Sequence, residues 1–276
     1  MEERGTALPA RRISRARRMS NTTVDVAALI GPYPYRELPH PDAGTLIGVL
    51  DREEIPRAWV GHLPTAFHRD PRKGNEALYR ELVPYRKRLD PSPAVRPDWP
   101  GWEKELARAV DEGALAVRAY PVHWGLGVEH PAMIDLGRAC ADRQLAVLLT
   151  VRFEDARQRH VIDVAGDLPA ATIRAIARAG TGARIVVVAA GRALIEEVHW
   201  GLTPAERELV WYDTSWIWGP PERDFEHILR TIGATRFVYG TGWPLRLAQV
   251  TRANLALLPP DLVGARLTDP TTWQVT

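Results

Sequence analysis

The densest group of side chains suited to acid–base and anion chemistry lies between residues 152 and 160. Arg152, Glu154, Asp155, Arg157 and His160 follow directly after an apolar segment. Arginine forks bind carboxylates and phosphates through paired contacts, and Asp155 or His160 has the chemistry to move a proton. These residues predict binding of a small anionic molecule. The alternative is a salt-bridged loop that only orders the rim of the fold.

Other polar residues also follow apolar segments. They are His68 and Arg69, then Arg118, Tyr120 and His123, and finally Asp213. Arg118 ends an apolar run, so its charge needs a partner in the interior. Asp213 and Asp155 are the candidate partners. A structural ion pair between Arg118 and Asp213 is therefore the alternative to substrate binding by Arg118.

Four of the ten tryptophans lie in the same kind of position. Trp124, Trp216, Trp218 and Trp243 follow apolar segments. If they converge, they form an aromatic wall suited to a ring-bearing ligand; otherwise they cap the core. We assign as candidate catalytic residues His160, Asp155, His123 and Asp213. We assign as candidate substrate-binding residues Arg118, Tyr120, Arg152, Arg157, His68, Arg69, Trp216 and Trp243.

Eight strand-like and eight helix-like segments alternate along the chain and must position these residues. The predicted strands are 24–29, 58–63, 92–97, 114–120, 146–153, 184–190, 209–215 and 236–239. The predicted helices are 43–54, 75–88, 102–112, 133–143, 170–179, 193–200, 223–231 and 247–258. Most strands are continuously apolar, as buried parallel strands are. The pattern predicts an α/β fold, a single (β/α)8 TIM barrel over residues 23–276, with an open doubly wound sheet as the alternative.

Composition excludes several classes of protein. The longest apolar run is Ile185–Ala190, too short to span a bilayer, so we expect no membrane partner. The single cysteine, Cys140, allows no internal disulfide, and with no secretory signal evident we expect a cytoplasmic location. Residues 1–22 hold six arginines and two glutamates, a net +4, which leaves −2 for the remainder. We expect this arginine-rich tail to be disordered, and we expect no nucleic-acid partner.

Four segments resemble a known family: Val24–Gly31, Val117–Pro121, Ala183–Gly191 and Val238–Pro244. They are similar to strands 1, 4, 6 and 8 of the amidohydrolase superfamily, in its amidohydrolase-related branch of TIM barrels. That branch includes lactonases and decarboxylases of small acids. The resemblance runs from Val24 to Leu258 and implies a barrel fold, with a homo-oligomer as a further possibility.

The resemblance also implies where a catalytic metal would lie. In the family, a His-x-His pair on strand 1 and histidines on strands 5 and 6 hold a divalent ion, which activates water, and a strand 8 aspartate is the base. The corresponding positions here are Ala27, Leu29, Thr150, Ala189 and Gly242. Alanine, leucine and glycine side chains cannot ligate a metal. We therefore expect the inherited metal site to be absent, and we expect no cofactor.

Three functions remain open at this point. The first, which we favour for its many loop arginines, is a metal-independent hydrolase, lactonase or C–C lyase acting on a small carboxylate. The second is a catalytically inactive barrel that serves as a ligand-binding or partner protein. The third is a hydrolase with a relocated metal site built from His68, His123, His160 and Asp155.

Overall fold

The computed structural model describes residues 23–274, and the predicted tail, residues 1–22, lies outside the described residues. Strands and helices alternate along the chain. The strands are β1 (Val24–Ile30), β2 (Arg57–His62), β3 (Leu89–Pro91), β4 (Ala116–Ala119), β5 (Ala146–Thr150), β6 (Arg184–Val188), β7 (Val210–Asp213) and β8 (Phe237–Val238). The helices are α1 (Ala43–Arg52), α2 (Arg72–Leu82), α3 (Trp102–Asp111), α4 (Pro131–Ala141), α5 (Ala170–Arg178), α6 (Arg192–Trp200), α7 (Pro204–Arg207), α8 (Asp224–Thr231) and α9 (Gln249–Ala256).

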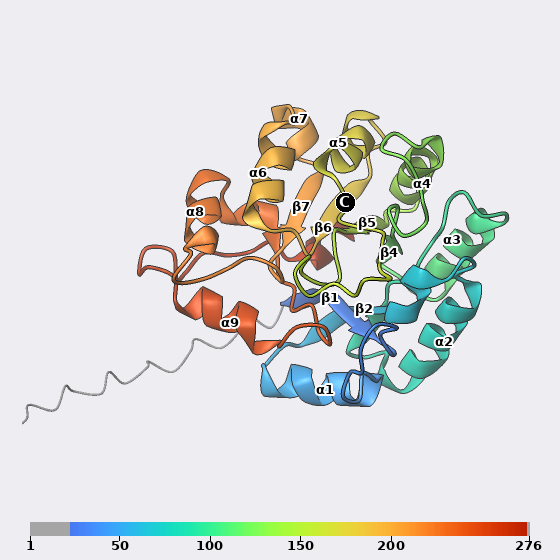
Figure 1. The fold of residues 1–276 in the computed structure, drawn as a ribbon, viewed down its shortest axis with the longest axis horizontal. Helices are drawn as coiled ribbons and strands as arrows, with labels where there is room; N and C mark the ends of the chain where they lie inside the picture. The colour runs from blue at the N-terminus through green and yellow to red at the C-terminus, as the bar shows by residue number, and fades with distance from the viewer. Residues whose placement is uncertain (1–22, 275–276) are drawn as a thin grey trace, which may run out of the picture.

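The strands are parallel and pair in two runs, β1-β2-β3 and β4-β5-β6-β7-β8. Backbone hydrogen bonds join the two runs at both edges. The Val95 N–H donates to the Arg118 carbonyl at 3.0 Å, and the Val26 N–H donates to the Tyr239 carbonyl at 3.0 Å. The strands therefore form a closed ring, and the helices lie around it (Figure 1). This arrangement confirms the predicted (β/α)8 barrel.

The third strand differs most from its prediction. It was expected over residues 92–97, whereas β3 ends at residue 91 and only Ala94 continues the pairing, through a bridge to Arg118. Three prolines between residues 91 and 97 lack an N–H group and cannot donate to the strand ladder. The short α7 was not predicted, although Thr203 and Glu206 form a capping box at its start.

Alternate residues of each strand face opposite layers. In β5, Val147 and Leu149 belong to the core shared with the helices, whereas Leu148 belongs to a separate core inside the ring. The same alternation directs Arg118 of β4 and Asp213 of β7 to the interior, because their neighbours in the strands pack outward. Two ionisable side chains thus enter the ring from strands whose other inward residues are apolar.

The opposite end of the ring is covered by the last described segment. Trp273 packs against Trp59 at 6.2 Å and against Trp211 at 4.5 Å between ring centroids. These side chains adjoin the interior core that holds Val24 and Ala116, the first residues of β1 and β4. Access to the interior is therefore from the carboxyl ends of the strands. Within residues 23–274, none of the helices is long and apolar enough to cross a membrane.

Candidate functional site

An inner cavity of about 20 Å³ lies inside the ring at the carboxyl ends of the strands. It is lined by Ala27, Leu29, Arg118, Thr150, Arg152, Phe153, Val188, Ala189, Ser215, Trp216, Gly242, Leu245 and Arg246. These residues come from β1, β4, β5 and β6 and from the segments that follow β5, β6, β7 and β8. Barrels of this architecture place their sites at this end, where the strand-to-helix loops meet.

Arg118 is the buried cation of this cavity, with 1% of its surface exposed. Its Nε donates to the Ser92 hydroxyl at 2.9 Å, and its Nη2 donates to the carbonyls of Val26 at 2.9 Å and Ala28 at 3.1 Å. Those carbonyls lie where the pairing of β1 with β2 shifts its register. Burial lowers the pKa of Arg118.

A glycine on β2 makes room for this arginine. A Cβ atom at Gly61 would overlap the Nε of Arg118 and lie 2.6 Å from its Cδ. Carbon atoms in contact are normally separated by about 3.5–4.0 Å, so a larger residue at position 61 cannot coexist with this arginine rotamer. Gly61 and the register shift in β1 together fix where the guanidinium lies.

Five polar atoms of residues that line the inner cavity have no hydrogen-bond partner. They are Arg118 Nη1, Thr150 Oγ1, Arg152 Nε, Ser215 Oγ and Arg246 Nε. Buried polar groups are nearly always paired in folded proteins, so five unpaired atoms at one cavity are exceptional. Among the described residues, those that line this cavity include three arginines and no aspartate or glutamate. The residues around the cavity thus carry positive charge and unpaired polar atoms, whereas most of the surface that faces the cavity is apolar.

Two of the three arginines contact one indole ring at the rim. The Arg246 guanidinium lies 4.4 Å from the Trp216 ring centroid and 4.9 Å from that of Trp218. The Arg152 guanidinium lies 5.6 Å from the Trp216 centroid and is paired with Asp167 at 2.7 Å. Within the described part of the chain, Arg246 makes no ion pair. These cation–π contacts hold both guanidiniums beside the cavity.

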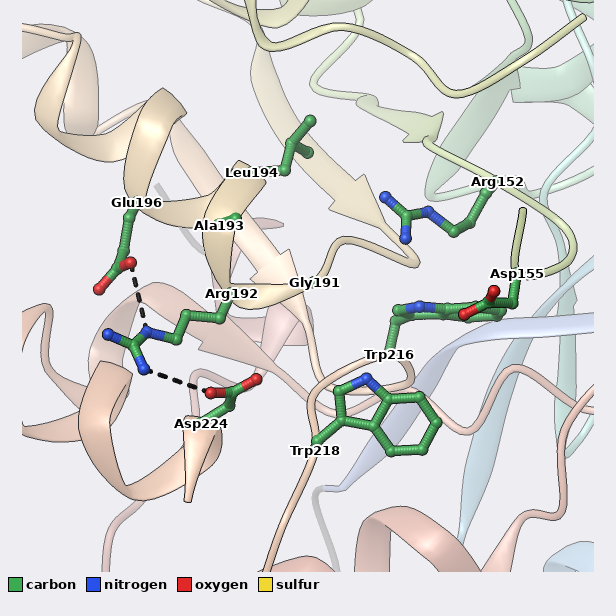
Figure 2. Close-up of a pocket in the computed structure, with 10 residues that line it drawn as sticks. All are labelled: Arg152, Asp155, Gly191, Arg192, Ala193, Leu194, Glu196, Trp216, Trp218 and Asp224. Atoms are coloured by element: carbon green, nitrogen blue, oxygen red, sulfur yellow. Dashed lines mark hydrogen bonds and ion pairs between the residues drawn. The ribbon is translucent and has the colours of Figure 1, made fainter. Parts of the chain in front are cut away.

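An outer pocket of about 510 Å³ adjoins the inner cavity, and Arg152 and Trp216 line both. Figure 2 shows Arg152 pointing across this pocket above the Trp216 ring, with Trp218 beneath. Arg192 also lines the pocket, but it is held between Glu196 and Asp224 at 3.3 Å each. The remaining lining residues are Asp155, Gly191, Ala193 and Leu194.

Two buried aspartates lie close to the inner cavity. Asp213 accepts hydrogen bonds from the backbone N–H groups of Ala189 at 2.7 Å and Ser215 at 3.2 Å. Burial raises the pKa of Asp213 to about 6. Asp25 accepts from the Thr241 hydroxyl at 2.5 Å and from the Thr241 N–H at 3.0 Å, and burial raises its pKa. The ion pair between Arg118 and Asp213, the alternative to substrate binding by Arg118, is not formed in the described structure, because each side chain is satisfied mainly by backbone groups.

The remaining candidate catalytic residues lie away from the inner cavity. Asp155 lines the outer pocket and is paired with Arg157 at 2.8 Å. The His123 ring packs against Phe153 at 5.1 Å, its Nε2 lies 3.7 Å from an Asp163 oxygen, and burial lowers its pKa. His160 is exposed and stacks on Tyr35. Neither histidine lines either cavity.

Of the candidate binding residues, Arg118, Arg152 and Trp216 meet at the inner cavity. The residues that line neither cavity are Tyr120, Arg157, His68, Arg69 and Trp243. Tyr120 is buried against Trp124, and Trp243 is buried in the core beneath α1. The four tryptophans therefore divide: Trp216 and Trp218 adjoin the cavities, whereas Trp124 and Trp243 pack in the interior.

Sequence reasoning did not assign Ser215 or Arg246. Ser215 lies two residues after Asp213, so the two-residue period of a strand would have placed both on the same side. Arg246 lies in the irregular segment after β8, where no period indicates the direction of a side chain.

The four positions that the resemblance assigns to metal ligands and the fifth, Gly242, that it assigns to the base all line the inner cavity. Of Ala27, Leu29, Thr150, Ala189 and Gly242, only Thr150 carries a side-chain oxygen, and a neutral hydroxyl is a poor ligand for the usual divalent ions. Across residues 23–274, no three histidine, cysteine, aspartate or glutamate side chains come together in a group that could hold a metal ion. These residues do not fit the metal that the resemblance implies.

No protein-family model and no curated protein matches this chain. Solved structures match it across nearly its full length. A 2,6-dihydroxybenzoate decarboxylase from Rhizobium is 14% identical, with 91% of this chain and 98% of that chain covered and a TM-score of 0.66. An amidohydrolase II is 15% identical, with 91% and 98% covered and a TM-score of 0.63.

A third similar structure is a probable 2-pyrone-4,6-dicarboxylic acid hydrolase from Acinetobacter baumannii with citric acid bound. It is 12% identical, with 92% of this chain and 100% of that chain covered and a TM-score of 0.59. In fold, the chain is thus an amidohydrolase-like (β/α)8 barrel, which confirms the expected resemblance at the level of fold.

Proposed function

We propose that this protein is an amidohydrolase-like barrel enzyme that acts on a small carboxylate-bearing substrate without a catalytic divalent metal. The observation that carries the proposal is the charge of the inner cavity, which three arginines and no acidic side chain line within the described residues. An anionic ligand would relieve the repulsion between these guanidiniums and pair with their free donors. Proteins of similar fold include a dihydroxybenzoate decarboxylase and a pyrone-dicarboxylic acid hydrolase, whose substrates are carboxylic acids.

The arginines would bind and orient the substrate. Arg118 lies deep in the ring, and Arg152 and Arg246 lie at the rim on the Trp216 ring. The outer pocket is large enough for a small ring, and Trp216, Trp218 and Leu194 give it apolar surface. A carboxylate in the inner cavity would therefore leave the body of the substrate in the outer pocket, against Trp216.

Asp213 is the group best placed to hold or move a proton. Its raised pKa of about 6 lies near neutrality, where a general acid–base is most effective. Ser215 connects Asp213 to the cavity, because its N–H donates to Asp213 and its hydroxyl lines the cavity. In a decarboxylation, this proton would replace the departing CO₂ on the same carbon; in hydrolysis of a lactone, it would pass to the leaving oxygen.

One observation favours the alternative of an inactive ligand-binding barrel. Asp213 does not line either cavity, and both of its oxygens accept backbone hydrogen bonds. A carboxyl group held in this way orders the end of β7 without reaching a substrate. In that case the inner cavity would bind an acid and no turnover would follow.

The test combines metal content with activity. The full chain, purified without a histidine tag, is measured for bound metal by elemental mass spectrometry. It is then assayed with a chelator on small aromatic and aliphatic carboxylic acids and lactones. We expect well under one metal per chain and turnover that persists in chelator. About one metal per chain, with activity lost on chelation, would refute metal independence.

A matched pair of variants separates the cavity from the surface. Arg246→Met removes a rim guanidinium and should weaken acid binding by about tenfold or more, the value of one charge-assisted contact. Arg138→Met makes the same change on exposed α4, where Arg138 pairs with Asp135, and should leave binding unchanged. Acid binding without any turnover would select the inactive barrel.

A further inference from the structure

Three of the unpaired donors at the inner cavity are almost fully buried. Arg118 is 1% exposed, Ser215 is 2% exposed and Thr150 is 6% exposed. They come from β4, from the segment after β7 and from the end of β5. Their unpaired atoms are a guanidinium nitrogen and two hydroxyl oxygens, and all three residues line one small cavity. Three separate elements thus bring residues with unpaired hydrogen-bonding atoms to the same cavity.

The chemistry of these groups selects the ligand. A guanidinium only donates hydrogen bonds, and serine and threonine hydroxyls each have a proton to donate. A ligand that accepts a hydrogen bond from all three together needs several acceptor lone pairs. An ionised carboxylate, with two acceptor oxygens, meets this requirement, whereas an amine or a metal cation would face the positive charge of Arg118.

The size of the cavity limits the ligand further. Its volume of about 20 Å³ is little more than one water molecule requires. Leu29, Phe153 and Val188 form apolar parts of its wall. A carboxylate group alone approaches this size, and a ring or a longer chain far exceeds it.

We propose that Arg118 Nη1, Thr150 Oγ1 and Ser215 Oγ form a site for a single carboxylate group, with Arg118 as a resident cation among the positions where the family resemblance implies a metal. This inference rests on the proposed function and names the subsite within it. The site accepts formate, the carboxylate group without a body. Larger acids insert their carboxylate here and leave their body in the outer pocket.

The guanidinium is fixed before any ligand arrives. Nε is held by Ser92 and Nη2 by the carbonyls of Val26 and Ala28, so Nη1 is the nitrogen left for a ligand. The hydroxyl of Tyr120 also lies near the guanidinium. Burial raises the pKa of Tyr120, so this hydroxyl stays neutral and cannot neutralise Arg118.

The experiment is a titration of the full chain with sodium formate. Binding is measured by calorimetry and from the NMR signal of ¹³C-formate. Chelator is present, and sodium chloride at equal ionic strength is the control. A second titration uses benzoate. We expect saturable binding of both acids. Thr150→Val and Ser215→Ala each remove one hydroxyl with little change in shape and should each weaken both acids by about tenfold. Thr172→Val, a buried threonine on α5 away from the cavity, should leave both affinities unchanged.

The outcomes separate this inference from the proposed function. If the wild-type chain binds benzoate but not formate, or if Thr150→Val and Ser215→Ala leave formate affinity unchanged, the single-carboxylate site is wrong and the proposed function stands. If the wild-type chain binds neither acid, both are wrong. Arg118→Met should abolish formate binding. The Arg118→Met variant also leaves backbone carbonyls unpaired. If it does not fold, Thr150→Val and Ser215→Ala test the single-carboxylate site.

Discussion

Substitution of Gly61 by alanine tests the position of Arg118 without touching any polar group. A Cβ at Gly61 would overlap Arg118 Nε and lie 2.6 Å from Cδ, well inside normal contact distance. The arginine cannot yield locally, because its far end is held by Ser92, Val26 and Ala28. Gly61→Ala must therefore displace the guanidinium and break its hydrogen bonds.

The size of the effect follows from what is displaced. Each hydrogen bond to a charged group contributes about 1.5–3 kcal/mol net, and a buried charge left without its partners costs about 3–5 kcal/mol. We expect Gly61→Ala to lower the free energy of unfolding by about 3–5 kcal/mol, a large share of the 5–15 kcal/mol typical of a folded domain. Formate affinity should fall together with stability, because Nη1 moves with the rest of the side chain.

Urea denaturation measures the stability, and calorimetry with formate measures the site. The matched control is Gly48→Ala on exposed α1, where an added Cβ meets nothing within 4 Å. There, alanine should raise the free energy of unfolding by up to about 1 kcal/mol, through helix propensity. If Gly61→Ala unfolds within about 1 kcal/mol of the wild-type chain and binds formate as tightly, the fixed position of Arg118 is refuted.

Three further predictions follow from the cavity and the core. Asp213 has a folded pKa of about 6 against 3.8 in the unfolded chain, so its protonated form favours folding. The free energy of unfolding of the wild-type chain, relative to that of Asp213→Asn, should therefore fall by about 2 kcal/mol between pH 4 and pH 7. A difference between the two chains that does not change with pH in urea unfolding would contradict this. Trp216→Leu removes the ring that contacts Arg246 and should weaken benzoate binding by roughly 3- to 30-fold, because the cation–π contact is lost. The control Trp200→Leu removes the exposed ring beside Arg207 and should leave benzoate binding unchanged. Equal benzoate affinities of Trp216→Leu and the wild-type chain would exclude Trp216 from the site. Burial raises the pKa of Cys140 to about 12, so its thiol should react with a disulfide reagent at pH 8 only after unfolding in urea, and rapid reaction of the native chain would show that this core opens.

The architecture could be predicted because its signals are local. Buried parallel strands are continuously apolar, and β5 and β6 are read directly from 146–150 and 184–188. The third strand could be predicted only approximately, because its prolines limit pairing to a few residues. The short α7 carries its capping signal in Thr203 and Glu206, and its four residues are too few for a helical period.

The candidate site could be predicted only in part, because its geometry depends on backbone that sequence patterns do not show. Strand alternation directs Arg118 inward, but its partners are carbonyls at a register shift, which no side chain encodes. The histidine-bearing loops also follow strand ends, as expected. Their length places His160 at an exposed position, stacked on Tyr35, beyond the cavity that the strand ends define.

The buried aspartates and the buried arginine inside the ring differ in how completely the fold satisfies their hydrogen bonds. Asp25 and Asp213 receive their hydrogen bonds from backbone N–H groups and from Thr241, so their lone pairs are occupied within the fold. Arg118 donates to four acceptors and still keeps Nη1 unpaired, and Thr150 and Ser215, which line the same cavity, add unpaired hydroxyls. The polar groups left open at this cavity are therefore a guanidinium nitrogen, which only donates, and two hydroxyls, which can donate or accept. A cavity with that balance discriminates against cations and in favour of anions, whatever reaction follows, because a bound carboxylate supplies the acceptors that the chain itself does not.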